Sequence, residues 1–242
     1  MKVEVCCGSY ADAYNAYLGG ANRVELCSSL FFGGLTPSLA TLRLTKLNLN
    51  LETAVMLRAR QAGFCYSNIE QSVMQEDARI FIDNGADSLV FGFLTSKGEI
   101  DFASTKKMVD IINGRCKCVF HRAYDASISS AEQDAVRLKE IGIDRILTSG
   151  KAVTAQQGKQ TIKRLVELNL LEIVACGKIR KENLQEIVKF TNCSYVHISA
   201  FEERFDASNN GQIKFCKTTL PQESSFDLVS VEKVKEIVEL TK

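Results

Sequence analysis

Short apolar runs and longer amphipathic stretches alternate eight times along this chain. The runs are rich in Val, Ile, Leu, Phe and Cys, and several are almost continuously apolar, which is typical of strands covered on both faces. We predict strands at 3–7, 23–27, 51–58, 88–92, 115–121, 145–148, 171–175 and 194–198. The stretches that follow them predict helices at about 9–19, 37–47, 69–84, 101–113, 129–141, 152–168, 180–190 and 228–240.

The predicted helices end in a recurring way. Gly20, Gly85 and Gly142 each stand after a helical stretch and shortly before the next strand. Glycine suits the left-handed turn that ends many helices, so these joints mark repeated αβ units. Strict alternation predicts parallel strands covered by helices, and eight pairs favour closure. We therefore predict an α/β fold, a TIM-like (β/α)8 barrel, with residues 1–242 as a single domain.

Two connections break this rhythm. Residues 58–68 and 199–227 are long and follow strands, so we expect both at the carboxyl end of the barrel. Barrels of this kind place their functional sites at that end. Chemistry-bearing residues near strand ends are therefore the first candidates for a site.

Composition narrows the classes of partner and compartment. The formal net charge is +1, and the basic residues are spread along the chain, which argues against nucleic acid as a partner. No apolar run is long enough to span a bilayer, and Glu4 stands where a signal peptide would have its apolar core. Nine cysteines without a framework spacing are typical of thiols in a reducing compartment. We expect a cytoplasmic protein without a membrane partner, and the sequence leaves homo-oligomerisation open.

Two cysteines stand at the carboxyl ends of the first two predicted strands. Cys6 and Cys27 would lie near the same rim if those strands are neighbours, because adjacent backbones are roughly 4.8 Å apart. Two adjacent thiols suit a soft ion such as Cu(I) or Zn(II). The alternative is that both are buried packing residues, and spacing alone favours that alternative.

Charged residues interrupt the same two strands. Glu4, Arg23 and Glu25 fall within runs that should be buried, and a buried charge needs a partner. Arg58 ends the third strand at the same rim. We predict that Glu25 is paired with Arg58, with a Glu4–Arg58 pair as the alternative.

Arginines and histidines at strand ends suggest a second function. Arg58, Arg60 and Arg122 could hold a small anionic ligand, since a guanidinium binds a carboxylate or phosphate with two parallel hydrogen bonds. His121 and His197 both fall at strand ends, where histidine acts as a general acid or base, a metal ligand or a structural residue. We predict that His121 shares a pocket with these arginines and His197. The corresponding hypothesis is a TIM-barrel enzyme of unknown reaction that acts on a small anionic metabolite.

Several segments together resemble the CutC family of copper homeostasis proteins. The resemblance runs through Ala200 and weakens after it. It implies a TIM-like barrel, a cytosolic location, a role in copper handling, and Cu(I) bound by Cys6 and Cys27. In the copper-binding hypothesis that follows, Glu4 and Glu25 support the ligands or are structural. The segments that carry the resemblance are Glu4-Val5-Cys6, Gly20-Ala21-Asn22-Arg23-Val24-Glu25-Leu26-Cys27, Gly33-Gly34-Leu35-Thr36-Pro37-Ser38, Arg58-Ala59-Arg60, Phe64-Cys65-Tyr66-Ser67, Phe120-His121-Arg122-Ala123-Tyr124-Asp125, Arg145-Ile146-Leu147-Thr148-Ser149-Gly150 and His197-Ile198-Ser199-Ala200.

The chain departs from the family pattern in loops at the carboxyl end. Ala59 replaces a usual proline, Gln61-Ala62-Gly63 replaces Gly-Gly-Asp, and Cys176-Gly177-Lys178 replaces a run of three glycines. These changes spare Cys6 and Cys27. A copper homeostasis protein that binds Cu(I) is therefore the first functional hypothesis, and the enzyme is the alternative.

Overall fold

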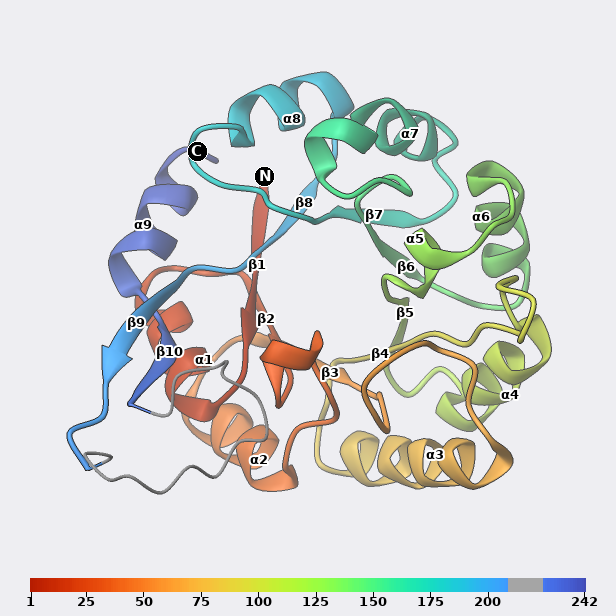
Figure 1. Cartoon of the computed structure of the whole chain (residues 1–242), viewed down its shortest axis with the longest axis horizontal. Helices are drawn as coiled ribbons and strands as arrows, with labels where there is room; N and C mark the ends of the chain where they lie inside the picture. Colours follow the sequence, from red (N-terminus) through yellow and green to blue (C-terminus); the bar gives the residue numbers. More distant parts are fainter. Residues whose placement is uncertain (209–223) are drawn as a thin grey trace.

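Eight parallel strands close into a barrel in this computed structural model, which describes residues 1–208 and 224–242 (Figure 1). Each strand pairs with the next in sequence, and the last pairs with the first. This order confirms the predicted (β/α)8 fold. The strands are β1 (Lys2–Cys7), β2 (Arg23–Leu26), β3 (Glu52–Met56), β4 (Ser88–Phe91), β5 (Lys117–Phe120), β6 (Arg145–Thr148), β7 (Glu172–Ala175) and β8 (Tyr195–Ile198).

Helices surround the barrel on its outer side (Figure 1). The predicted helices are present, and their ends shift by a few residues, most at the start of the seventh, which was predicted at 180 and begins at Leu184. The described part contains none that is long and apolar enough to cross a membrane. The helices are α1 (Tyr10–Leu18), η1 (Leu30–Phe32), α2 (Leu39–Asn48), α3 (Asn68–Asp83), α4 (Phe102–Ile112), α5 (Ala123–Ala126), α6 (Ala131–Glu140), α7 (Ala155–Glu167), α8 (Leu184–Thr191) and α9 (Val231–Glu239).

Local sequence sets the helix ends. The Ser67 hydroxyl accepts a hydrogen bond from the Glu70 backbone N–H at the start of α3, and the Glu70 carboxylate accepts one from the Ser67 backbone N–H. This reciprocal cap satisfies donors that the first helical turn leaves free. Gly85 and Gly142, which follow α3 and α6, have φ values of 85° and 102°, as the glycine stops predict.

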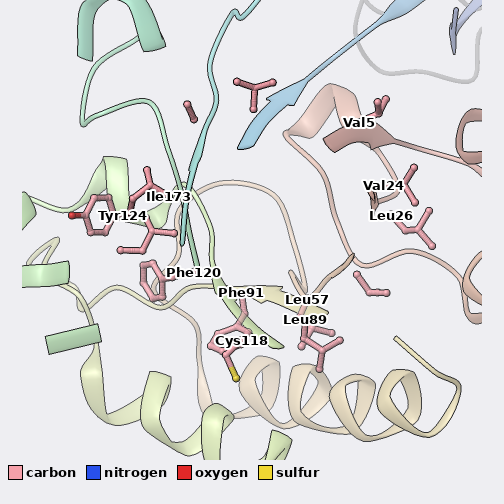
Figure 2. Packing of buried hydrophobic residues seen from close by; sticks show 14 of the residues in the cluster. Val5, Val24, Leu26, Leu57, Leu89, Phe91, Cys118, Phe120, Tyr124 and Ile173 are labelled. Atoms are coloured by element: carbon pink, nitrogen blue, oxygen red, sulfur yellow. The ribbon is translucent and has the colours of Figure 1, made fainter. Parts of the chain in front are cut away.

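The core has two layers because side chains alternate across each strand. Outward-facing residues such as Val5, Val24 and Leu89 pack against the helices (Figure 2). Inward-facing residues form two smaller apolar clusters inside the barrel. One consists of Leu147, Val174, Cys176 and Tyr195, and the other of Cys6, Cys27, Ala54, Met56, Val90 and Val119. The two candidate thiols therefore belong to the barrel interior.

Two segments of the connection 199–227 form strands that the sequence analysis did not predict. β9 (Phe201–Phe205) and β10 (Ser225–Val229) form an antiparallel two-stranded sheet beside the barrel (Figure 1). The predicted helix at 228–240 starts later for this reason, at Val231. Half of the residues of these two strands are exposed, and their polar side chains interrupt the alternation of apolar and polar positions that would have predicted strands. Residues 209–223 lie outside the part that the structure describes.

Candidate metal centre and the cavity above it

Pairing between β1 and β2 brings the two candidate thiols together. Cys6 is aligned with Glu25 in the register, and Cys27 continues the ladder beyond β2 by donating its backbone N–H to the Cys7 carbonyl. Ligand atoms of Cys6, Cys27 and Glu25 all lie within 4.8 Å of one another, and all three residues are buried. Neighbouring strands therefore place two thiols and a carboxyl group at one point, as the strand argument predicts for the cysteines.

Glu25 joins the two sulfur atoms. Its Oε2 lies 3.6 Å from Cys27 Sγ and 3.9 Å from Cys6 Sγ. Its Oε1 is buried and has no hydrogen-bond partner among the described residues. Burial disfavours the carboxylate and raises the pKa of Glu25 to about 8. Glu25 is therefore mostly protonated near neutral pH, and one of its oxygens is free for another ligand.

Glu4 and His197 form the next part of the site. His197 Nδ1 lies 2.6 Å from Glu4 Oε1, and its Nε2 lies 3.9 Å from Glu25 Oε2. Burial opposes ionisation of Glu4, but His197 and Arg23 outweigh it and lower the pKa of Glu4 to about 2. Burial also opposes the charge of His197, and Glu25, Cys6 and Glu4 together raise its pKa well above the ordinary value. The site thus holds an imidazolium next to the thiols.

The two thiols differ in acidity. A hydrogen bond from the Cys27 thiol to the Cys6 sulfur, together with His197, outweighs burial and lowers the pKa of Cys6 to about 6. The same bond and burial raise the pKa of Cys27 well above its ordinary value. Cys6 is therefore a thiolate near neutral pH, and the thiolate is the form that binds metals.

A charged layer lies below these groups, at the amino ends of the strands. Arg23 donates its Nε–H to Glu4, and its Nη1 lies 3.3 Å from both Glu52 and Glu172. Arg145 lies 2.7 Å from the same two carboxylates. Sequence reasoning missed Glu52, Glu172 and Arg145 as partners, although each of them opens a strand. This layer explains how Glu4 and Arg23 can lie in buried strands.

The predicted Glu25–Arg58 pair is wrong, and so is the alternative with Glu4. Arg58 stands beyond the end of β3, and its Nη1 donates to the carbonyls of Phe32 at 2.8 Å and Gly34 at 3.0 Å. Its Nη2 donates to the carbonyl of Ala62 at 2.6 Å. The side chain is therefore drawn into the surrounding loops, which offer closer acceptors than the barrel interior does.

The other two predicted arginines differ in position. Arg60 pairs with Glu70 and donates to the carbonyls of Gly63 and Cys65, so it holds its own loop against α3 and does not line the cavity. Arg122 lines the cavity and donates to Asp125 and to the Ser149 hydroxyl, both at 2.8 Å. Including Arg60 in the anion site was therefore wrong.

A cavity of about 990 Å³ opens at the carboxyl end of the barrel above the thiols. It brings together His121, His197, Arg58 and Arg122 as predicted, without Arg60. Cations of the loop after β7 also line it, which the sequence analysis did not single out. Among its lining residues are Cys6, Glu25, Cys27, Met56, Phe64, Leu147, Lys178, Arg180, Phe201 and Phe226.

His121 is neutral and incompletely paired. Its Nδ1 accepts a hydrogen bond of 3.1 Å from the Ala123 backbone N–H, which places the ring proton on Nε2. Burial, with the nearby charge of Arg58, lowers the pKa of His121 to about 3. Within residues 1–208 and 224–242, Nε2 has no hydrogen-bond partner. His121 therefore presents a buried donor that lacks an acceptor.

Comparison with known proteins identifies the family of this chain. A sequence model of the CutC family matches residues 1–202. The chain belongs to the CutC family. A CutC family protein of Treponema denticola is 40% identical and covers 98% of both chains. The human copper homeostasis protein cutC homolog is 35% identical, over 99% of this chain and 89% of its own length.

Solved structures show the same fold. CutC from Streptococcus agalactiae superimposes with a TM-score of 0.77 at 31% identity, over 81% of this chain and 97% of its own. Thiamine phosphate pyrophosphorylase from Pyrococcus furiosus reaches a TM-score of 0.59 at 13% identity, over 99% of this chain and 94% of its own. The second similarity concerns the barrel fold alone.

The donor set of this CutC family member fits copper. Cys6 and Cys27 offer soft sulfur ligands, and Glu25 has a buried oxygen without a partner. The eight cysteines that the structure describes are all free thiols, so neither sulfur is engaged in a disulfide. His197 stands close enough to Glu25 to join or support the same centre.

Proposed function

We propose that this protein is a cytosolic copper homeostasis protein that binds Cu(I) between Cys6 and Cys27. The observation that carries the proposal is the grouping of both sulfur atoms with a Glu25 oxygen within 4.8 Å, at the bottom of a cavity. The family to which the chain belongs supports copper as the ion, because relatives carry the name copper homeostasis protein.

Each residue of the centre has a distinct role in this proposal. Cys6 supplies a thiolate before the ion arrives, and Cys27 releases its proton when it binds. Glu25 and His197 hold the sulfur atoms in place, while Glu4 fixes the orientation of the imidazole. The ion is the cargo of the protein, and the barrel supplies the rigid framework.

A competition experiment tests the proposal. Wild-type protein loaded with Cu(I) is titrated with a chelator that gives a coloured Cu(I) complex, and a Cys6→Ser/Cys27→Ser variant is treated in the same way. We expect the variant to lose tight binding and keep its fold, as measured by circular dichroism. A Cys65→Ser/Cys116→Ser variant is the matched control, since neither residue lies at the centre. Equal Cu(I) affinity in all three proteins would contradict the proposed copper site at Cys6 and Cys27.

One observation favours a second candidate function, an enzyme that acts on a small anionic metabolite. The cavity has the volume of typical ligand pockets and is lined by two histidines and by Arg122. A screen of metabolites for thermal stabilisation of the metal-free protein tests it, because a ligand of the folded state raises the melting temperature. No shift with any carboxylate or phosphate compound would count against the enzyme.

A further inference from the structure

The cavity is much larger than a single ion needs. Its volume of about 990 Å³ lies at the upper end of the range for sites that bind small organic molecules. Met56, Leu147 and Phe201 give it apolar walls. A Cu(I) ion between Cys6 and Cys27 would occupy only its floor. The remaining volume is available to an organic molecule lying directly above the ion.

The floor and the opposite wall of this cavity have different chemistry. Cys6 lies in β1 and Cys27 directly follows β2, whereas His121 directly follows β5, which stands across the closed barrel from β1. The floor therefore offers soft sulfur ligands to a metal. The wall beyond β5 offers hydrogen-bond donors and positive charge.

Two buried donors on the lining have no acceptor among the described residues. They are His121 Nε2 and Arg58 Nε, and both residues contact the ring of Phe64. Arg58 forms no ion pair with any described carboxylate, because carbonyl groups take its other donors. A buried donor without a partner is costly, so these atoms point to a ligand that brings an acceptor.

Cations extend this wall towards the opening. Arg122 donates to the Ser149 hydroxyl, and Gly177 packs against the Ser149 side chain, so Arg122 and Lys178 stand on the same side of the cavity. The Lys178 ammonium has no hydrogen bond or ion pair within the described part. Arg180, two residues further along the loop after β7, also lines the cavity.

Acidic groups on the lining leave most of this charge uncompensated. Asp12 is bonded to the backbone N–H groups of Gly8 and Val229 and to the Ser9 hydroxyl. Glu25 faces the thiols, and Asp227 stands on β10. Arg122 alone among the wall cations has a carboxylate partner, Asp125, in the described residues. The wall therefore favours a negatively charged group.

We propose that this cavity binds a small thiol that carries carboxylate groups, with its sulfur on the Cu(I) ion and its carboxylates towards His121, Arg122 and Lys178. This inference rests on the proposed Cu(I) site. The ligand's sulfur donates an electron pair to Cu(I), its proton passes to solvent, and no oxidation state changes. The anionic thiol thereby completes the sulfur coordination that two protein cysteines begin.

Three probes separate the parts of this proposal. Mercaptosuccinate carries a thiol and carboxylates, thioglycerol is a neutral thiol, and succinate has carboxylates without sulfur. Cu(I)-loaded protein is incubated with each, and X-ray absorption counts the sulfur neighbours of copper. We expect mercaptosuccinate to add a sulfur neighbour at concentrations several-fold lower than thioglycerol needs, and succinate to add none.

Variants compared in the same medium remove the contribution of copper–thiol chemistry in solution. Wild-type protein should need less mercaptosuccinate than thioglycerol to add a sulfur neighbour to copper, and Lys178→Gln should reduce this difference in concentration. His121→Leu should reduce it more than His121→Gln does, because glutamine keeps an N–H donor. Lys181→Gln is the matched control, because Lys181 is exposed, pairs with Glu236 and does not line this cavity. The control should behave like wild type.

The outcomes distinguish this inference from the proposed function. If wild-type protein fails to bind Cu(I) without any added thiol, the copper site itself is wrong. If it binds Cu(I) but mercaptosuccinate and thioglycerol act alike, or Lys178→Gln matches Lys181→Gln, the anionic thiol site alone is overturned. Succinate that displaces mercaptosuccinate at equal concentration would show a plain anion pocket and also overturn it.

Discussion

Replacing Glu4 by glutamine removes the carboxylate that lies between two buried cations. Glu4 is 5% exposed, accepts from Arg23 Nε and lies 2.6 Å from His197 Nδ1. Glutamine has nearly the same shape and keeps hydrogen-bonding groups, so the change tests charge more than packing. We expect Glu4→Gln to destabilise the metal-free protein clearly.

The magnitude follows from the acidity of Glu4. Its pKa falls from 4.5 to about 2 on folding, a difference of about 2.5 units. At 1.36 kcal/mol per unit, the folded state favours the ionised form by about 3 kcal/mol. The usual cost of removing one partner from a buried ion pair, roughly 3–5 kcal/mol, agrees with this value. In the variant, Arg23 keeps Glu52 and Glu172 as partners, so we expect the loss of stability to lie near the lower end of that range.

Urea unfolding at several pH values measures this loss. A carboxyl group whose pKa is lowered by folding stabilises the protein above its unfolded pKa, and the stabilisation disappears as pH falls from about 4.5 towards 2. The difference in the free energy of unfolding between wild type and Glu4→Gln should therefore be largest at pH 7 and become smaller below pH 4.5. Glu99→Gln, an exposed change, is the control. A loss no larger than that of the control, or a difference that stays constant into acid, would refute the reasoning.

Three further changes test other parts of the structure. Folding lowers the pKa of the buried His121 from 6.5 to about 3, so below pH 6.5 the imidazole is protonated in the unfolded chain and stays neutral in the folded one. This difference should reduce the free energy of unfolding of wild type by about 2 kcal/mol between pH 7 and pH 5, and His121→Gln should lack that part of the pH dependence in urea unfolding. Gly158→Ala should destabilise the folded protein by roughly 1–3 kcal/mol and lower its thermal midpoint, because the added Cβ would stand 1.9 Å from the Ser149 carbonyl oxygen. In the control Gly63→Ala the added Cβ meets open space, so the thermal midpoint should change little. In Arg58→Lys, a lysine cannot form the three hydrogen bonds that Arg58 donates to carbonyl groups, so we expect a lower thermal midpoint and faster proteolysis of the loop at 59–66. Unchanged proteolysis would contradict the role of Arg58 in holding that loop.

The barrel could be predicted from the sequence because its strands are buried on both faces. Runs such as 88–92 and 145–148 contain consecutive apolar residues, Leu89-Val90-Phe91 and Ile146-Leu147, and glycines such as Gly85 and Gly142 mark the joints between units. The strands β9 and β10 could not be predicted in the same way, because they form an exposed pair whose polar residues conceal the alternation. Burial, rather than strand propensity, carried the signal.

The candidate site was predictable where it depends on backbone register and not where it depends on loops. Cys6 and Cys27 meet because β1 and β2 are adjacent, and a parallel ladder fixes which residues lie side by side. Arg58 and Arg60 stand in a connection whose carbonyl groups compete for their donors, and no spacing rule reports where those carbonyl groups lie. The direction of a long side chain at a strand end is therefore decided by the loop around it.

The charged layer below the thiols links the stability of the barrel to the chemistry at its mouth. Arg23 is 1% exposed and contacts Glu4, and Glu4 in turn orients His197 beside the sulfur atoms. An apolar layer at the amino ends of the strands would pack as well, but it would leave Glu4 without Arg23. Glu4 would then have His197 as its remaining cationic partner, so burial would oppose its ionised form more effectively and its support for the positive charge beside the Cys6 thiolate would weaken. The buried arginine thus supports a reactive sulfur through two intervening side chains, which explains why a barrel interior retains a charge that packing alone does not require.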